Sequence, residues 1–399
     1  MRLADGSHLT YCSNIHPGET WDEVLHAVVT HYPSVAGKVA AGMRFGVGLR
    51  LSDRASRDLD EAGLLDEFRG LLDAHGLYVF TLNGFPYGAF HGTRVKADVY
   101  QPDWRDDARL QYTDRLARQL ARLLPLDGSV TGSVSTVPGA YKSDVRGADD
   151  IERMRRQIVR HAATLVTIAH ETRRQIVLAL EPEPCCFLET VDESVRFFRE
   201  QLFGPASVRQ LGALTGLDAV DAERALRRHL GLCLDLCHAA VEFEDPRDCL
   251  RQLAEAGIPI AKLQISAGLR IAAMGPAALD ALQQYEDPVY LHQVVERTAS
   301  GLVRFTDLPE AFASLAGRAA PDEWRVHFHV PIFLDDLGVF RSTRDFIEAV
   351  LAIHRETPVS PHLEVETYTW NVLPAALRSG SIDGDIAREL AWVQERLAA

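Results

Sequence analysis

The sequence predicts an α/β protein built on one (β/α)8 barrel. Short apolar runs rich in strand-forming residues alternate with segments of helical pattern, as expected for parallel strands joined by crossover helices. Polar residues collect where several of these runs end, which is where barrel enzymes place their active sites. The 399 residues suffice for one elaborated barrel, and no Pro-, Gly- or Ser-rich linker divides them. We therefore expect a single barrel domain over residues 1–399.

Nine segments have the pattern of strands, one more than a barrel holds: 8–14, 44–51, 77–83, 132–137, 175–181, 230–236, 260–266, 324–330 and 362–367. Helical patterns separate them, for example an apolar stripe from Leu116 to Leu124 at three- and four-residue spacing. The stretches 201–230 and 268–322 are longer than a crossover needs and have helical character. We expect both to be helical insertions on the barrel.

The formal net charge of the chain is −14. Nucleic-acid binding depends largely on Lys and Arg side chains that neutralise phosphates, so this composition argues against a nucleic-acid partner. No stretch reaches the roughly 18 apolar residues needed to span a bilayer, and the first residues lack the apolar core of a signal peptide. We expect a cytoplasmic protein without a membrane span.

The six cysteines lack the paired spacing of a structural zinc site and are expected to be reduced thiols. Two of them, Cys233 and Cys237, flank Asp235 on a predicted strand. We favour their interpretation as small buried hydrophobic side chains over metal ligation, because free Cys is among the most buried residue types.

The fifth predicted strand brings a carboxylate to the barrel mouth. Its sequence QIVLALEPEP places Glu181 directly after an apolar run, and Pro182 and Pro184 end the strand. A carboxylate in such a place is costly to bury unless it meets a metal ion or another partner. Glu181 is therefore a candidate metal ligand and catalytic residue.

The strands that follow end in further donors. The sixth, LGLCLDLCHAA, carries Asp235 in an apolar run and His238 at the next turn, which suits an oxygen and nitrogen donor pair. The seventh carries Gln264. In the last, HLEVET, the even positions Glu364 and Glu366 share one face, which we expect to point into the barrel.

The segment 324–330 carries His327 and His329 on one face. At that spacing two imidazoles can coordinate one metal ion or bind substrate hydroxyls. A His-x-His pair on a strand is equally compatible with packing in the core.

A loop after the third strand, NGFPYGAFHG, begins with Asn83 and contains the aromatic residues Phe85, Tyr87 and Phe90. These rings would form an apolar wall for a sugar-like ligand, or they would simply close the top of the barrel. His16, after the first strand, is a further polar residue near the mouth.

Taken singly, each of these polar residues fits a structural role as well as a functional one. Their order along the chain is more informative, because a barrel brings the carboxyl ends of all its strands to one mouth. We therefore interpret the donors of the successive strand ends as parts of one site.

This strand-end pattern resembles the xylose isomerase-like barrels, a superfamily that includes sugar isomerases, sugar epimerases and a related endonuclease. The resemblance implies a divalent metal ion held by residues of the last four strands: Glu181, Asp235, Gln264 and Glu366. The seventh-strand ligand of that superfamily is usually His, and Gln264 stands in its place. A neutral amide oxygen is a weak ligand for a borderline metal, so the departure favours Mn²⁺ or Mg²⁺ over Zn²⁺, or an impaired site.

The resemblance also bears on the surplus strand. His327 and His329 resemble an extra donor pair that some members carry between the seventh and eighth strands. Segment 324–330 is then an excursion, and eight barrel strands remain.

Of the two carboxylates of the last strand, we expect Glu366 to reach the metal, because it lies nearer the carboxyl end of the strand. Glu364 is expected to lie one layer deeper. A buried Glu364 would need a partner, for which the candidates are His362, His327 or an arginine, or else it would be protonated at neutral pH.

Within the superfamily, the whole chain resembles the EboE family of metabolite-traffic proteins. The start HLTYCSNIHPGE, the loop LNGFPYGAFHG and the end PHLEVETYTW carry this resemblance. It implies a bacterial gene cluster that makes or moves a secondary-metabolite precursor.

The expected reaction is isomerisation or epimerisation of a sugar-like or cyclitol-like metabolite, in which Glu181 and Glu366 remove and return a proton and His238 orients substrate oxygens. One alternative is a barrel that binds or transfers a metabolite without turning it over, which Gln264 keeps open. Another is a metal-dependent phosphoester hydrolase, which the histidine pair permits. The expected partner is a small-molecule metabolite, and a homodimer is compatible with the sequence.

Overall fold

The computed structural model describes residues 1–89, 96–272, 274–286, 290–317, 321–370, 373, 378 and 380–398. Eight strands form a nearly closed barrel: β1 (His8–Tyr11), β2 (Phe45–Arg50), β3 (Leu77–Asn83), β4 (Gly132–Thr136), β5 (Ile176–Leu180), β6 (Leu230–Asp235), β7 (Ile260–Ile265) and β13 (His362–Val365). Their order is β1-β13-β7-β6-β5-β4-β3-β2, and every neighbouring pair is parallel. A parallel bridge between Cys12 and Gly48 joins the two ends of this order. The predicted (β/α)8 barrel is confirmed.

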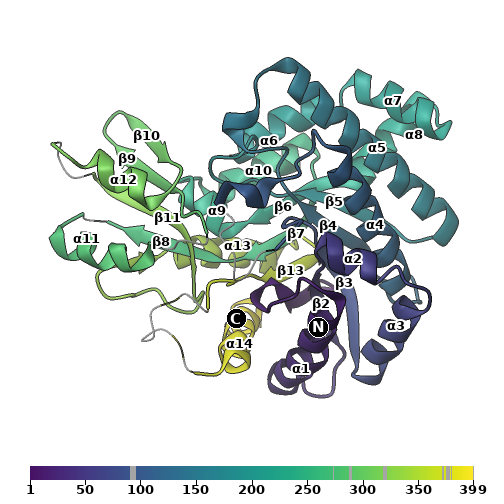
Figure 1. Ribbon diagram of the computed structural model, residues 1–399, viewed down its shortest axis with the longest axis horizontal. Helices are drawn as coiled ribbons and strands as arrows, with labels where there is room; N and C mark the ends of the chain where they lie inside the picture. The colour runs from purple at the N-terminus through teal and green to yellow at the C-terminus, as the bar shows by residue number, and fades with distance from the viewer. Residues whose placement is uncertain are drawn as a thin grey trace.

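Helices connect the strands and cover the outside of the barrel (Figure 1). They are α1 (Trp21–Val39), α2 (Asp53–Asp58), α3 (Leu64–Ala74), α4 (Asp107–Leu123), α5 (Ala148–Thr172), α6 (Val191–Phe197), α7 (Pro205–Thr215), α8 (Ala219–His229), α9 (Leu236–Val241), α10 (Pro246–Ala256), α13 (Arg344–Glu356) and α14 (Ile382–Ala398). Short turns of other helix types are η1 (Ser13–Ile15), η2 (Lys96–Tyr100), η3 (Lys142–Asp144), η4 (Phe198–Leu202) and η5 (Gln283–Tyr285).

Local sequence explains where these elements begin and what they bury. Helix α1 starts at a capping box in which Thr20 and Glu23 bind each other's backbone N–H groups. On α4 the predicted stripe from Leu116 to Leu124 is buried. All residues of β2 and β3 are buried, as expected when one face of a barrel strand packs on helices and the other fills the interior.

A second sheet stands beside the barrel, to its left in Figure 1. Its strands are all antiparallel and are ordered β10 (Gly301–Phe305), β9 (Val294–Thr298), β11 (Glu323–Val330), β8 (Ala267–Ile271) and β12 (Arg341–Ser342). Strand β11 is the surplus strand of the sequence, and its predicted place outside the barrel is confirmed.

The prediction that 268–322 is helical was wrong. This stretch contains most of β8 and all of β9 and β10, together with the helices α11 (Pro276–Leu282) and α12 (Leu308–Ser314). The Ala-rich run that forms α11 has a helical pattern, whereas each strand is only five residues long and is stabilised by antiparallel partners elsewhere in the chain. Short strands that depend on distant partners show little strand-like alternation in their own sequence.

The stretch 201–230 between β5 and β6 contains α7 and α8, which extend this crossover on the outside of the barrel. Among the helices that the structure describes, none combines the length and the apolar character needed to cross a bilayer.

Candidate metal centre

A pocket opens at the carboxyl ends of the barrel strands and has a volume of about 560 Å³ out to its mouth. One part of its wall is polar and the other aromatic. The lining includes Asn14, Asn83, Phe85, Tyr100, Glu181, Glu183, His238, Tyr290, His327, His329, Glu366 and Tyr368. Side chains from the ends of β1, β3, β5, β6, β13 and β11 therefore meet in one place.

Three carboxylates converge in this region. Glu181 directly follows β5, Asp235 is the last residue of β6, and Glu366 directly follows β13. One oxygen from each lies within 4.8 Å of the others, and all three side chains are buried. Glu181 Oε2 and Asp235 Oδ2 have no hydrogen-bond partner among the described residues.

Like charges at such distances cannot all stay ionised without a counter-charge. Burial, with Glu366 and Asp235 nearby, raises the pKa of Glu181 well above its usual range. Burial, with Asp235 and Glu364 nearby, raises the pKa of Glu366 to about 8. The three carboxylates therefore fit a divalent cation, whose charge would replace the protons that they otherwise need.

Neighbouring side chains orient these carboxylates. Asn14 and Asn83 both donate from Nδ2 to Glu366 Oε1, at 2.6 and 3.1 Å. Asp235 Oδ1 accepts from Ser266 Oγ at 2.7 Å and from the backbone N–H of His238 at 2.9 Å. In Asp235 this leaves Oδ2 as the oxygen that is free to bind a cation.

Gln264 lies apart from the pocket wall. It pairs in register with Asp235 on one side and with Glu364 on the other, and its side chain is fully buried. Its Oε1 accepts from Cys233 Sγ at 3.0 Å, so the amide oxygen is already engaged. Its role as a fourth ligand stays a prediction.

Glu364 is buried inside the barrel, and its partner differs from those that the sequence suggested. Lys262 Nζ of β7, also fully buried, forms an ion pair with Glu364 Oε2 and lies 3.4 Å from Ser135 Oγ. The expected partners, His362, His327 or an arginine, were wrong. The alternation of side chains along the strand predicts that Lys262 faces the barrel interior. It does not show that β13 lies beside β7, because that neighbourhood depends on the topology of the barrel.

A group of histidines stands next to the carboxylates. His238 Nδ1 lies 2.9 Å from the carbonyl oxygen of Pro182, and His329 Nδ1 lies 2.5 Å from that of Glu366. His327 Nδ1 lies 2.8 Å from the side-chain oxygen of Gln293. Each Nδ1 thus donates to an oxygen of the protein and leaves Nε2 directed elsewhere.

The Nε2 atoms of these histidines lie next to the carboxylates and to one another. His238 Nε2 and His327 Nε2 face each other at 3.1 Å, and His329 Nε2 has no partner among the described residues. Burial, with the neighbouring histidines, lowers the pKa of His327 well below its usual value, and burial lowers the pKa of His329 to about 4, so both are neutral. His327 and His329 would be able to offer their neutral imidazole nitrogens to a metal ion at this place.

Two groups of donors include these histidines: Glu183 with His238 and His327, and Asp235 with His238 and His329. Glu183 Oε1 accepts from Tyr100 Oη at 2.7 Å, and its Oε2 has no partner among the described residues. Glu183 was not predicted from the sequence. Its place in Glu-Pro-Glu-Pro, two residues after Glu181, was the available indication.

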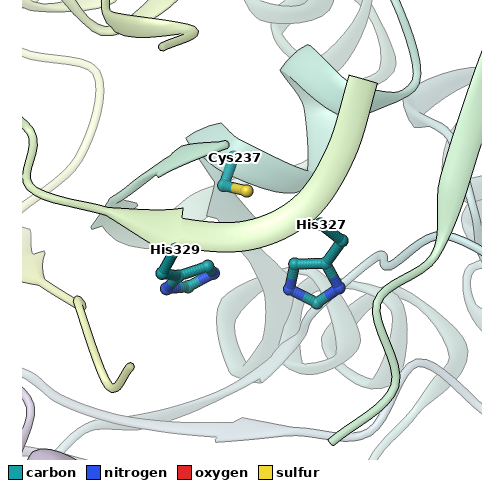
Figure 2. Close-up of side chains that lie close together, drawn as sticks. All are labelled: Cys237, His327 and His329. Atoms are coloured by element: carbon teal, nitrogen blue, oxygen red, sulfur yellow. The ribbon is translucent and has the colours of Figure 1, made fainter. Parts of the chain in front are cut away.

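Cys237 also lies close to His327 and His329 (Figure 2). In this view the two imidazoles extend to one side of β11 and the thiol lies on the other. Cys237 packs with Val241 and Val295, and burial raises its pKa well above the usual range. It is therefore a protonated core thiol.

The remaining predicted residues divide between the pocket and its surroundings. Phe85 lines the pocket, whereas the ring of Tyr87 packs against Tyr112, and Phe90 lies outside the described residues. His16 is buried away from the pocket, where it stacks on the ring of His31 at 4.0 Å.

Solved structures similar to this chain include the probable 3-DHS dehydratase AsbF from Bacillus anthracis, which is 11% identical with a TM-score of 0.47 over 97% of this chain and 98% of that chain. A xylose isomerase-like TIM-barrel protein from Mycobacterium smegmatis, in complex with magnesium, is 13% identical with a TM-score of 0.47. The match covers 97% of this chain and 98% of that chain. The IolI protein with a bound zinc atom is 12% identical with a TM-score of 0.47 over 98% and 97%. No protein-family model and no curated protein matches the sequence. These likenesses concern the fold and say nothing about the reaction.

Proposed function

We propose that this protein is a divalent-metal-dependent enzyme that isomerises or epimerises a small sugar-like or cyclitol-like metabolite. The observation that carries the proposal is the convergence of three buried carboxylates, Glu181, Asp235 and Glu366, beside an aromatic-walled pocket that Glu181 and Glu366 line. Glu181 and Asp235 each have an oxygen with no hydrogen-bond partner among the described residues. A bound cation would polarise a substrate carbonyl and make the adjacent C–H more acidic.

The chain itself supplies the groups that would move the proton. Glu181 and Glu366 come from β5 and β13, which β6 and β7 separate in the sheet, so they approach a substrate from different strands. One would remove the proton and the other would return it. His238, whose Nδ1 is held by the carbonyl oxygen of Pro182, would form a hydrogen bond with a substrate hydroxyl and so orient it.

We propose Mn²⁺ or Mg²⁺ as the ion of the carboxylate group, because hard oxygen donors favour these ions over Zn²⁺. The aromatic side chains Phe85, Tyr100, Tyr290 and Tyr368 would exclude water and contact the apolar face of a ring-shaped substrate. We propose a cytoplasmic role in a bacterial secondary-metabolite pathway of the kind that the EboE resemblance implies.

A second candidate function is metal-dependent hydrolysis of a phosphoester. The adjacent Nε2 atoms of His238 and His327, with Glu183 beside them, favour it, because they would supply donors for a second metal ion, and two neighbouring ions can bind the attacking and the leaving oxygen.

The test is to strip the protein with a chelator, reload it with Mn²⁺, Mg²⁺ or Zn²⁺, and count the bound ions. The loaded protein is then assayed for solvent-deuterium incorporation into a panel of ketoses and keto-cyclitols, and for hydrolysis of p-nitrophenyl phosphate esters. Deuterium incorporation that Asp235→Asn abolishes supports the proposal. Hydrolysis with two bound ions favours the second candidate, and metal binding without either activity indicates a metabolite-binding barrel.

A further inference from the structure

We propose that Glu389 of α14 is a positioning residue that holds the end of β11 against the end of β13, and so sets the distance between His329 and Glu366. This inference rests on the proposed metal centre, because those two residues offer donors to it. Glu389 lies 23 residues beyond Glu366 in the sequence, on the last helix of the chain.

The carboxyl group of Glu389 is buried, and a single oxygen makes both contacts. Oε1 accepts from Thr367 Oγ1 at 2.7 Å and from the backbone N–H of Ile332 at 3.2 Å. Thr367 directly follows Glu366, and Ile332 is three residues past His329. One side chain therefore binds both segments that leave the pocket.

The link through Glu389 matters because no backbone hydrogen bonds of a common sheet connect β11 and β13. β13 belongs to the barrel and β11 to the second sheet, and they are not neighbours in either. Among the described residues, side-chain contacts join them near the pocket. They include the bond from His329 Nδ1 to the carbonyl oxygen of Glu366 at 2.5 Å, the bond from Thr369 Oγ1 to the carbonyl oxygen of His329, the packing of the His329 ring on Tyr368, and the two contacts of Glu389.

The same contacts determine where His329 points. Its Nδ1 donates to the backbone beside Glu366, so a displacement of the β13 end also turns the imidazole and its Nε2 lone pair. Hydrogen bonds of this kind outside the ligand shell orient metal ligands, and their loss typically lowers metal affinity by about 10- to 100-fold.

The test compares Glu389→Ala, Glu389→Gln and Thr367→Val with the unchanged protein in two measurements: Mn²⁺ affinity by titration, and hydrogen exchange of residues 330–334 and 366–370 in the metal-free protein. Glu389→Ala should raise exchange in both segments and weaken Mn²⁺ binding by about 10- to 100-fold. Glu389→Gln keeps an acceptor oxygen and should stay within about 3-fold of the unchanged protein. Thr367→Val removes only the contact on the β13 side, so its Mn²⁺ affinity and exchange should lie between those of Glu389→Ala and Glu389→Gln. If Glu389→Ala does not fold, Thr367→Val provides the test.

The matched control is Gln119→Ala. Gln119 of α4 is also a buried polar side chain that binds a distant segment, because it donates to the carbonyl oxygen of Ser56 in α2 at 2.6 Å, but it lies outside the pocket lining. It should lower stability and leave Mn²⁺ affinity unchanged. Glu389→Ala with unchanged exchange, or with faster exchange and unchanged affinity, would overturn the proposal. An unchanged protein that binds no divalent ion, with faster exchange in Glu389→Ala, would instead reject the metal centre and reduce Glu389 to a structural contact.

Discussion

Glu364 and Glu366 are two residues apart and face the same interior, yet they meet different surroundings. Glu366 lines the pocket and is oriented by two asparagine amides. Glu364 lies in the barrel core and forms an ion pair with Lys262. A buried ion pair contributes little net stability, but removing one partner leaves an uncompensated charge.

The two carboxylates should therefore respond differently to the same substitution. Glu366→Gln is expected to weaken Mn²⁺ binding at least about tenfold, because it removes a charged ligand. Glu364→Gln leaves Lys262 without its counter-charge and is expected to cost about 3–5 kcal/mol of unfolding free energy. Mn²⁺ titration and urea denaturation of both variants check this. The reverse pattern would move the ligand one layer down the strand.

At the scale of elements, the backbone of β2 at Gly48 lies very close to β1 and to the side chain of Glu364. A Cβ at this position would lie 2.0 Å from Glu364 Oε1 and 2.6 Å from the backbone oxygen of Tyr11. The backbone contact cannot move aside without shifting β1. The absence of a side chain at Gly48 is thus what allows β1 and β2 to close the barrel around the buried Glu364.

Gly48→Ala is accordingly expected to destabilise the protein by about 1–3 kcal/mol or more, because overpacking forces the backbone to shift. Gly70→Ala is the matched control: Gly70 lies on the exposed face of α3, where a Cβ would meet no atom within 4 Å. That variant should gain about 0.5–1 kcal/mol. Equal urea midpoints for the two variants would contradict the close approach.

Across the whole molecule, the buried carboxylates link stability to pH. The pKa values of Glu181 and Glu366 are higher in the folded protein than in an unfolded chain, so the folded state binds more protons. The contribution of these two carboxyl groups to the free energy of unfolding is complete below the ordinary carboxyl pKa of about 4.3. It is lost as the pH rises through the pKa that each group has in the folded protein. For Glu366 that value is about 8.

We therefore expect the Tm of the metal-free protein to fall between pH 5.5 and pH 8, and Mn²⁺ to raise Tm more at pH 8 than at pH 6. At 100 times its Kd, a ligand stabilises by about 2.7 kcal/mol. Thermal unfolding at each pH, with and without Mn²⁺, measures both effects. In Glu366→Gln the fall should be smaller, and a Tm independent of pH in the unchanged protein would contradict the linkage.

The charge of the whole chain leads to a second expectation at this scale. With a formal net charge of −14, the protein should show no salt-sensitive binding to duplex DNA at physiological ionic strength. Fluorescence anisotropy with a labelled duplex at two salt concentrations tests this. Tight binding that weakens steeply with salt would require a basic surface that the composition makes improbable.

The sequence by itself determined the barrel and the carboxylates that stand at its strand ends. Strand-length apolar runs alternate with helical stripes, and the carboxylates Glu181, Asp235 and Glu366 stand at strand ends, because both patterns depend on residues that are close in the chain. Counting strands showed that one was surplus, and the resemblance to xylose isomerase-like barrels assigned 324–330 as the excursion.

Only the tertiary structure decided which distant residues meet. It paired Glu364 with Lys262 and engaged the Gln264 oxygen with Cys233. It also built the second sheet by adding β8, β9, β10 and β12, which the sequence did not mark, to the predicted strand β11. It also placed Glu389 between two strand ends. The physical reason is that side-chain alternation repeats every two residues along one strand, whereas barrel register and antiparallel pairing depend on contacts between segments far apart in the chain.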